Sequence, residues 1–419
     1  MKIFKFGGAS VKDANGVKNV AHIISHYGDG EVLVVISAMG KTTNALEKVV
    51  DACFHGKKEL KDYIEEIRSY HQNITNDLFP NNGEIWLNEV ENLFLELECL
   101  VDNENLQDDY DFLYDQIVTF GELISTRIVS AYLLSQNTRN QWLDARNFIL
   151  TDSRYRDANV QWEETNRVVQ NRLKPLSSRN LIITQGFMGK GFKGETTTLG
   201  REGSDYSAAI FGKLLQAESV TIWKDVAGVM NADPKKFPDS QLISELTYND
   251  AIELAYYGAS VIHPKTIQPL KHAGIPLFVK SFIHPDENGT KVSENGVTIQ
   301  VPCRILKQNQ ILLEISTRDF NFIAEESLQS IFAALSNHKV RVNIMQNSAI
   351  HFRCVFDNKE NKFVPLMAEL DTLGFNVKAT ENLQLLSIYQ PEDTTALGVE
   401  GRIVLEQNSG SANHYLLQL

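Results

Sequence analysis

The chain has 419 residues, a formal net charge of −13 and a pI of about 5.3, and 43% of its residues are hydrophobic. These values are typical of a globular protein long enough for two or three domains. The acidic balance argues against nucleic acid or an anionic membrane as the main partner, because both attract clustered Lys and Arg.

The cysteines and the N-terminus favour a cytoplasmic protein. The four cysteines are scattered without CxxC spacing, which favours free thiols over disulfides or a metal site. Gly7-Gly8 interrupts the N-terminus too early for the apolar core of a signal peptide. Apolar runs stay below the roughly 18 residues that a membrane helix needs. We therefore predict a cytoplasmic location and no membrane partner.

Short apolar runs alternate with helical patterns over the first three hundred residues. The runs at 3–6, 32–36, 181–184, 220–223 and 275–279 are apolar on both faces, which is typical of buried parallel strands. Residues 45–55 and 204–215 have helical patterns, and 46–134 is helical almost throughout, as in an insertion or lid. The sequence therefore predicts an α/β domain with an open, mainly parallel sheet sandwiched by helices.

The pattern changes after the turn-rich passage at 285–296. A strand at 311–315, a helix at 324–337, strands at 340–344 and 350–356, a helix at 363–373 and a strand at 383–389 follow in order. This β-α-β-β-α-β order predicts an α+β, ferredoxin-like unit. We place a domain boundary near residue 305, which divides the chain into 1–305 and 306–419.

Two strand-to-helix turns near the N-terminus are candidates for ligand binding. In the first, Gly7 and Gly8 let backbone N–H groups approach an anion, and Lys5 can bridge phosphate oxygens; a plain turn is the alternative. The second, 37–44, contains Gly-Lys-Thr. It is not a Walker A loop, because Val35 stands where the upstream glycine is required.

Two further segments have the composition of an anion site. Residues 186–205 combine six glycines, three threonines and Arg201 with Ser204-Asp205 at the start of a helix. The alternative is a surface hairpin with Ser204 as an ordinary N-cap. Lys224-Asp225 ends a predicted strand, and ligands of open parallel sheets bind at such ends; a turn with solvated charges is the alternative.

Six segments in this order resemble the aspartate kinase branch of the amino-acid kinase family. They are 5–10, 37–44, Gly121-Glu122 with Ser125, 196–205, 224–234 and 253–264. The resemblance covers residue 1 to about 300, and the unit after 305 resembles the ACT regulatory domain of the same enzymes. It implies transfer of the γ-phosphoryl group of ATP, with Mg²⁺, to the β-carboxylate of L-aspartate, giving 4-phospho-L-aspartate and ADP. This is the first step of lysine, threonine and methionine biosynthesis.

The resemblance also implies roles for individual residues. Lys5 contacts the transferring phosphoryl group and Asp205 organises the site around it, while the backbone of Gly7 and Gly8 cradles the phosphate. The remaining predicted contacts are Ser37, Thr43 and Ser204 with aspartate, Glu122 with its ammonium, Arg201 with its α-carboxylate, and Lys224, Asp225, Met230, Lys235, Ser260 and Val261 with the nucleotide. No side-chain metal site is predicted, because Mg²⁺ needs few protein ligands beyond phosphate oxygens. The β-carboxylate is ionised near pH 7, so the reaction needs no general base.

Three positions depart from the family pattern. Ala9 replaces a frequent Thr, Glu202 replaces a usual Gly, and Ser260 stands where many relatives have a Lys near the ATP phosphates. Lys224 stands where many relatives have Thr. Our hypothesis is that Lys224 supplies the charge that Ser260 lacks.

The regulatory half allows weaker predictions. Phe322, Ile323, Asn343 and Ser348 lie where lysine-sensitive relatives hold the effector, but those relatives have Asp in place of Asn343, so a cationic amino acid should bind less tightly. A second ACT unit is reduced in length, and 402–407 and 415–419 are candidate strands of a shared sheet. Because ACT units usually pair edge to edge, we predict a homodimer.

Two other functions stay open. The chain resembles other amino-acid kinases, such as those acting on glutamate or acetylglutamate, although 253–264 and the ACT-like unit argue against them. A catalytically dead amino-acid sensor is favoured only by Glu202 and Ser260. The sequence leaves open whether lysine, threonine or no effector inhibits.

Overall fold

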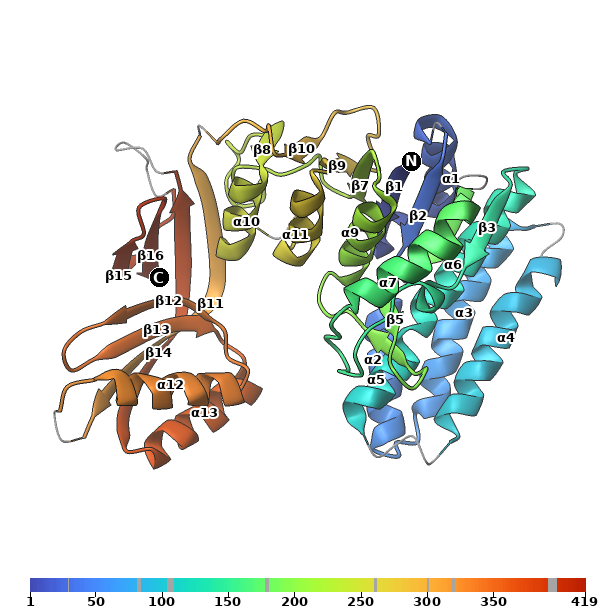
Figure 1. Ribbon diagram of the computed structural model, residues 1–419. Coiled ribbons are helices and arrows are strands. Elements are labelled where there is room, and N and C mark those ends of the chain that lie inside the picture. The colour runs from blue at the N-terminus through green and yellow to red at the C-terminus, as the bar shows by residue number, and fades with distance from the viewer. Residues whose placement is uncertain are drawn as a thin grey trace. The chain divides into compact units, whose positions relative to one another are not determined.

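The computed structural model describes residues 1–28, 30–80, 84–103, 109–177, 181–259, 262–299, 301–318, 321–390 and 398–419 (Figure 1). Two compact units are present. The first comprises 1–229, 242–252 and 261–298, and the second comprises 230–241, 253–260 and 299–419.

An eight-stranded sheet forms the centre of the first unit, in the order β3-β4-β2-β1-β7-β9-β10-β8. Its strands are β1 (Lys2–Phe6), β2 (Val32–Ile36), β3 (Asn140–Leu143), β4 (Leu181–Gln185), β7 (Ser219–Lys224), β8 (Glu245–Thr247), β9 (Leu277–Ser281) and β10 (Thr290–Ser293). All neighbouring pairs are parallel except β9 and β10, which are antiparallel. The five predicted strands and the mainly parallel sheet are confirmed.

Successive side chains of β1 point to opposite faces of the sheet, and helices cover both faces. Phe4 and Phe6 join the core beneath α1 (Ala14–Tyr27) and α6 (Phe120–Ser135), where Trp223 stacks on Phe6 with ring centroids 6.0 Å apart. Ile3 and Lys5 have the opposite parity and lie on the face covered by α9 (Gly203–Leu215) and α11 (Pro264–Ala273). The sheet is thus sandwiched by helices, as the apolar strands predict (Figure 1).

The helical stretch near the N-terminus also matches its prediction. It contains α2 (Thr42–Phe54), α3 (Leu60–Leu78), α4 (Glu84–Val101), α5 (Tyr110–Val118) and α6. Among the described residues, one helical stretch, Tyr110–Ser135, is long and apolar enough to cross a membrane, but 83% of its apolar window is buried inside the protein. The apolar composition of this stretch is explained by its burial inside the protein, as in a core helix.

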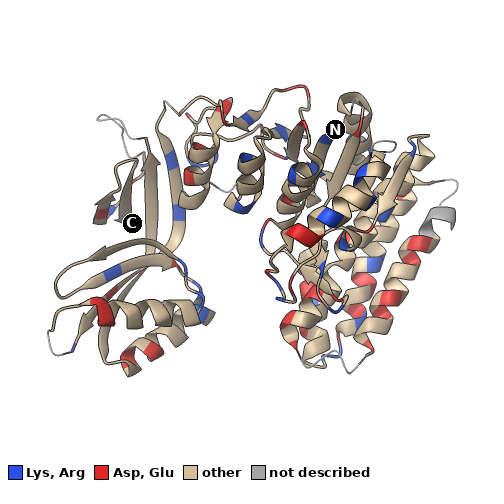
Figure 2. Cartoon of the chain, in the orientation of Figure 1, with Lys and Arg blue, Asp and Glu red and all other residues tan. Residues whose placement is uncertain are grey.

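Acidic residues form bands along α4 (Figure 2). Arg68 of α3 pairs with Glu91 and Glu98, and Arg127 of α6 pairs with Glu89 at 2.9 Å. Part of the net negative charge is therefore balanced locally, where the neighbouring helices of the bundle meet.

Smaller elements complete the first unit. They are the short helices η1 (Gly8–Val11), η3 (Ala145–Asn147), α7 (Trp162–Val168), η4 (Val169–Leu173) and α8 (Lys174–Ser177), the hairpin β5 (Met188–Lys190) and β6 (Thr196–Thr198), and α10 (Tyr248–Tyr257), which continues into the second unit.

The second unit contains the predicted β-α-β-β-α-β order. Its elements are β11 (Cys303–Thr317), α12 (Glu325–Asn337), β12 (Val342–Asn347), β13 (Phe352–Asp357), α13 (Glu360–Thr372) and β14 (Phe375–Tyr389), followed by β15 (Arg402–Asn408) and β16 (Ala412–Gln418). The sheet order β12-β13-β11-β14-β16-β15 is antiparallel throughout. The two candidate strands near the C-terminus therefore extend the ferredoxin-like sheet as a hairpin.

Candidate active site

A cavity of about 620 Å³ lies in the first unit, beside the residues that follow β1 and β2 and the N-terminus of α9. Eight residues predicted for the site line it: Lys5, Gly8, Ser37, Thr43, Glu122, Arg201, Ser204 and Asp205. Parallel strands end at one edge of the sheet, so segments that are far apart in sequence meet there.

The buried carboxylate of Asp205, which lines this cavity, pairs with two lysines, of which only Lys5 also lines it. Asp205 is fully buried; one of its oxygens lies 2.6 Å from Lys5 Nζ and the other 3.3 Å from Lys224 Nζ. Lys5 comes from β1 and Lys224 from the end of the adjacent β7, so the parallel pairing of these strands brings the two ammonium groups to one partner.

The charges of this cluster shift one another's pKa values. Burial alone would raise the pKa of Asp205, but the charges of Lys5 and Lys224 outweigh it and hold the pKa below its ordinary value. Burial would lower the pKa of Lys224, but Asp205 and Glu202 raise it above the usual value. The charged forms of Asp205 and Lys224 therefore stabilise each other.

The N-terminus of α9 opens onto the same cavity. Helix α9 begins at Gly203, and its N-cap residue is Glu202, whose side chain makes no capping hydrogen bond. Ser204 therefore lies inside the first turn, and the alternative of Ser204 as an ordinary N-cap is wrong. The first backbone N–H groups of a helix carry a partial positive charge that favours anions.

Glu122 supplies a carboxyl group from the first turn of α6. Its side chain is buried, Oε1 accepts a hydrogen bond from the Ala38 backbone N–H at 3.2 Å, and Oε2 has no hydrogen-bond partner among the described residues. Burial raises the pKa of Glu122 to about 8, against the lowering effects of Ala38 and Lys5. A buried carboxylate oxygen without a donor is suited to bind a cationic ligand group.

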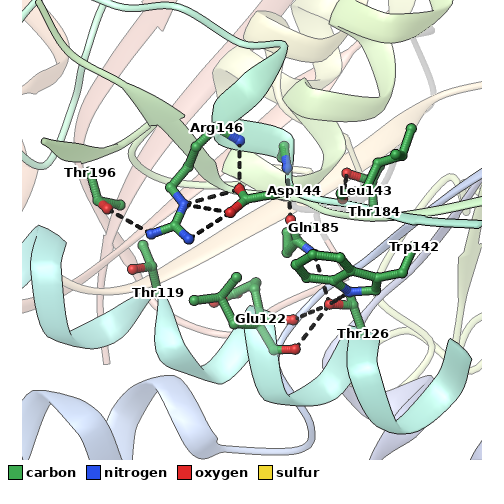
Figure 3. Close-up of polar contacts among 12 residues, drawn as sticks. Thr119, Glu122, Thr126, Trp142, Leu143, Asp144, Arg146, Thr184, Gln185 and Thr196 are labelled. Carbon is green, nitrogen blue, oxygen red and sulfur yellow. Dashed lines mark hydrogen bonds and ion pairs between the residues drawn. The ribbon is translucent and has the colours of Figure 1, made fainter. Parts of the chain in front are cut away.

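Buried hydrogen bonds fix the helix that carries Glu122 (Figure 3). The Thr126 hydroxyl donates to the Glu122 carbonyl at 2.8 Å and accepts from Trp142 Nε1 and Gln185 Nε2, each at 2.9 Å. Gln185 in turn accepts from the Ala145 N–H at 2.8 Å. Since Trp142 and Gln185 belong to β3 and β4, the sheet sets the position of α6.

Close backbone packing shapes the loops after β1 and β2. The Gly40 N–H donates to the Gly8 carbonyl at 3.0 Å, and a Cβ on Gly8 would lie 2.7 Å from the Ala38 oxygen. On Gly7 a Cβ would meet only Lys5 Nζ, at 3.4 Å. The contact between the two loops therefore requires glycine at residue 8. The sequence suggested a different reason, which was the approach of a phosphate to the backbone.

The cavity has a second arginine that the sequence did not indicate. Arg156 lies over the ring of Tyr114 at 4.2 Å and pairs with Asp111 at 3.1 Å. Its backbone has a φ of +65° and its N–H donates to the buried Asp115. Residue 156 lies in an irregular segment without periodicity, so no local pattern could have identified it. Arg201, in contrast, makes no hydrogen bond or ion pair with another described residue.

Some residues predicted to contact the nucleotide lie elsewhere. Asp225 is exposed after the end of β7, and Met230 and Lys235 belong to the second unit. Ser260 and Val261 lie outside the described residues. The described residues contain no group of three or more His, Cys, Asp or Glu side chains that could hold a metal ion.

The predicted effector residues lie just before α12, within β12 and just after β12 in the second unit. Phe322 is 74% exposed and Ile323 is buried just before α12. Asn343 on β12 accepts from Lys307 Nζ at 2.8 Å and donates to Gln310 at 2.7 Å. The Ser348 hydroxyl donates to the His351 carbonyl at 3.1 Å. The Asn343 amide is therefore engaged within the unit itself.

Comparisons with known proteins show which family the chain is similar to. A model of the amino acid kinase family matches residues 1–281. The lysine-sensitive aspartokinase 3 of Escherichia coli is 31% identical over 413 residues, covering 95% of this chain and 88% of the relative. Chloroplastic aspartokinase 2 of Arabidopsis thaliana is 30% identical, covering 94% of this chain and 73% of the relative.

Solved structures extend the likeness to the fold of the whole chain. The structure of Escherichia coli aspartokinase III in complex with aspartate and ADP, in the R-state, matches with a TM-score of 0.83 at 29% identity, covering 100% of this chain and 96% of that one. The complex of that enzyme with lysine and aspartate, in the T-state, matches with a TM-score of 0.82 at 28% identity. By its family model, its relatives and its fold, the chain belongs to the amino acid kinase family and, within it, to the aspartokinases.

Proposed function

We propose that the chain transfers the γ-phosphoryl group of ATP to the β-carboxylate of L-aspartate. The observation that carries this proposal is the composition of the cavity. Two lysines on a buried aspartate and the open end of α9 attract phosphates, and the unpartnered oxygen of Glu122 in the same cavity attracts an ammonium group. Similarity to an enzyme solved with aspartate and ADP supports both ligands.

Catalysis in this site consists of positioning and charge neutralisation. The attacking β-carboxylate and the phosphoryl group are both negative, so the barrier contains the repulsion between two anions. Lys5 and Lys224 place positive charge where they meet, and Asp205 fixes both ammonium groups in advance. Mg²⁺, entering with ATP, would be held mainly by the nucleotide itself and would neutralise part of the phosphate charge.

Substrate recognition is assigned to the residues around Glu122. Glu122 binds the ammonium of aspartate and Arg201 its α-carboxylate, which directs the β-carboxylate toward Lys5. Ser37, Thr43 and Ser204 complete the pocket with hydroxyl groups. Asp225, Met230, Lys235, Ser260 and Val261 are proposed to border the nucleotide, and Gly7 to approach its phosphates.

We also propose a division of labour between the units. The first unit, within the predicted 1–305, carries out the reaction. The second unit, which contains the predicted 306–419, has the ACT-type fold and binds an amino-acid effector near Phe322, Ile323, Asn343 and Ser348. The similar enzyme solved with lysine in its T-state supports such a site. Because Asn343 is neutral and already holds Lys307, lysine should inhibit weakly.

Two features of the whole protein remain proposals. The second sheet has β12 and β15 at its edges, and an exposed strand edge can pair with another copy, so we propose a homodimer with a reduced second ACT unit. Sedimentation at micromolar concentration should give the dimer mass, and a monomer would contradict it. We propose the cytoplasm as its location.

An aspartyl hydroxamate assay with ATP and Mg²⁺ tests the function. Hydroxamate should form with aspartate but not with glutamate or acetylglutamate, and Lys5→Ala should abolish its formation. Parallel reactions with lysine and threonine test for an effector. Product from glutamate would favour another amino-acid kinase, and nucleotide binding without any product would favour the dead sensor.

A further inference from the structure

Glu202 is an anion placed where the cavity otherwise gathers positive charge. Its carboxylate Oε2 lies 3.7 Å from Lys224 Nζ, next to Asp205 and the N-terminus of α9. Burial raises the pKa of Glu202, and Asp205 adds to the rise while Lys224 opposes it. An ionised carboxylate at residue 202 would repel phosphates, so we ask what Glu202 contributes to the site.

The backbone at Glu202 also favours a different residue. Its φ of +56° and ψ of +25° lie in the left-handed region, where residues with a Cβ are strained and glycine is not. Strain of this kind persists at functional sites when the surroundings hold the residue in place. Glu202 thus stands in a position that neither its charge nor its backbone favours.

The contact with Lys224 explains why a glutamate can occupy position 202. Its side chain is 18% exposed and its ammonium lies between two carboxylates, at 3.3 Å from Asp205 and 3.7 Å from Glu202. Asp205 is shared with Lys5, so without Glu202 the two lysines would share a single buried anion. Glu202 therefore gives Lys224 a second carboxyl group as a neighbour.

We propose that Glu202 is a resident counter-ion that pairs with Lys224 when the site is empty and is displaced from it by the nucleotide phosphates. This inference rests on the proposed function and extends it to the control of nucleotide affinity. Phosphate oxygens replace Glu202 as partners of the Lys224 ammonium, and the Glu202 side chain, which is 32% exposed, turns toward solvent. Each nucleotide must therefore compete with an internal anion, which weakens its binding.

Calorimetric titration with MgADP, in the absence of aspartate, tests the competition on the full chain. Glu202→Gln removes the charge and keeps the side-chain size, and we expect MgADP to bind about tenfold more tightly, equivalent to about 1.4 kcal/mol. Glu202→Gly should bind as tightly and also melt at a higher temperature, because glycine relieves the positive φ. Glu195→Gln is the matched control: Glu195 precedes β6, does not line the cavity and accepts from the Lys193 N–H, so affinity should stay unchanged.

The Lys224→Met background separates competition from simple repulsion. If Glu202 acts by holding Lys224, the gain from Glu202→Gln should shrink below about threefold when Lys224 is absent, because these neighbouring effects are coupled. An equal gain in both backgrounds would show through-space repulsion and overturn the proposal. Unchanged or weaker binding by Glu202→Gln would overturn it as well.

Steady-state kinetics add a readout that a structural role would not change. Glu202→Gln should lower KM for ATP severalfold and leave KM for aspartate within twofold. Failure of the proposed function can be distinguished from failure of the counter-ion proposal, because titration with MgADP requires no turnover. A chain that binds MgADP but phosphorylates no amino acid contradicts only the proposed function.

Discussion

At the scale of single residues, the site depends on one carboxyl group that burial holds partly protonated. The pKa of Glu122 is raised to about 8, so below that pH the empty site contains a neutral carboxyl group. Pairing with the aspartate ammonium requires the ionised form. Substrate binding should therefore release a proton, and affinity should depend on pH.

We expect KM for aspartate to fall as the pH rises from 6 to 8 and then to level off, because Glu122 becomes ionised over this range. Glu122→Gln should raise KM for aspartate by about tenfold or more and flatten the pH profile. The measurement is KM for aspartate between pH 6 and 9 at saturating ATP. A wild-type profile without slope below pH 8 would contradict the role of Glu122.

The free energy of unfolding provides the control for this variant. The pKa of Glu122 in the folded state lies above the unfolded value of 4.5. Its contribution to the free energy of unfolding is therefore complete below pH 4.5 and is lost as the pH rises through 8. Glu122→Gln stays neutral at every pH, and it should be more stable than the wild type by roughly 2 to 4 kcal/mol at pH 8. Lost affinity with gained stability excludes misfolding as the cause.

The two arginines of the cavity can be distinguished by equal substitutions. Arg201 has no partner among the described residues and is available to a carboxylate, whereas Arg156 is held by Asp111 and Tyr114. Lys lacks the planar fork that binds a carboxylate through two hydrogen bonds. We expect Arg201→Lys to raise KM for aspartate at least about tenfold and Arg156→Lys to change it by less than about threefold. The opposite order would assign the α-carboxylate to Arg156.

At the scale of elements, the sequence was most informative where side chains repeat or glycines gather. The five buried strands and the β-α-β-β-α-β order follow from apolar patterns, and Lys5, Arg201 and Asp205 lie beside glycine-rich turns. Strands β3, β8 and β10 were not predicted, because each is at most four residues long and lacks a continuous buried run. Arg156 and Tyr114 join the cavity only through tertiary packing.

The contact between the loops after β1 and β2 gives a prediction at this scale. A Cβ at residue 8 would lie 2.7 Å from the Ala38 oxygen and 2.8 Å from the Gly40 oxygen, both of which are backbone atoms. Gly8→Ala should therefore force the loops apart and reduce stability by about 1 to 3 kcal/mol, with a loss of kcat. Urea unfolding measures the loss of stability, and the hydroxamate assay measures the loss of kcat.

Gly7→Ala is the matched control for this packing argument. A Cβ at residue 7 meets only the flexible end of Lys5, at 3.4 Å, and the φ of Gly7 is −79°, which alanine tolerates. Stability should change by less than about 0.5 kcal/mol. Equal destabilisation by both substitutions would mean that the turn, and not the contact between the loops, requires glycine.

At the scale of the whole molecule, buried ionisable groups make folding depend on pH in opposite directions. Burial raises the pKa of Glu122 and brings that of Asp115 to about 6, so both groups favour folding more strongly as the pH falls. Burial lowers the pKa of His71 to about 4, and this residue acts in the other direction. The pH dependence of the free energy of unfolding is therefore a sum of opposing effects, and the contribution of each group must be measured separately.

His71 joins three helices of the first unit. It lies on α3 with Nδ1 2.7 Å from the Ile67 carbonyl, Nε2 3.5 Å from the Thr42 hydroxyl of α2, and its ring beside Phe94 of α4. The residue is fully buried, so a proton on it would place an unpaired charge in the helical core. The folded state therefore keeps the imidazole neutral.

The contribution of His71 can be isolated as a difference between two proteins. Its folded pKa is depressed below the unfolded value of 6.5, so its contribution is complete above pH 6.5 and is lost as the pH falls toward 4. Relative to His71→Gln, the wild type should lose about 3 kcal/mol between pH 6.5 and 4. Tryptophan fluorescence during urea unfolding measures it, because all four tryptophans lie within residues 86–223 of the first unit. His22→Gln, at an exposed position of α1, should give no such slope, and a flat difference for His71→Gln would show that the helical core admits the charge.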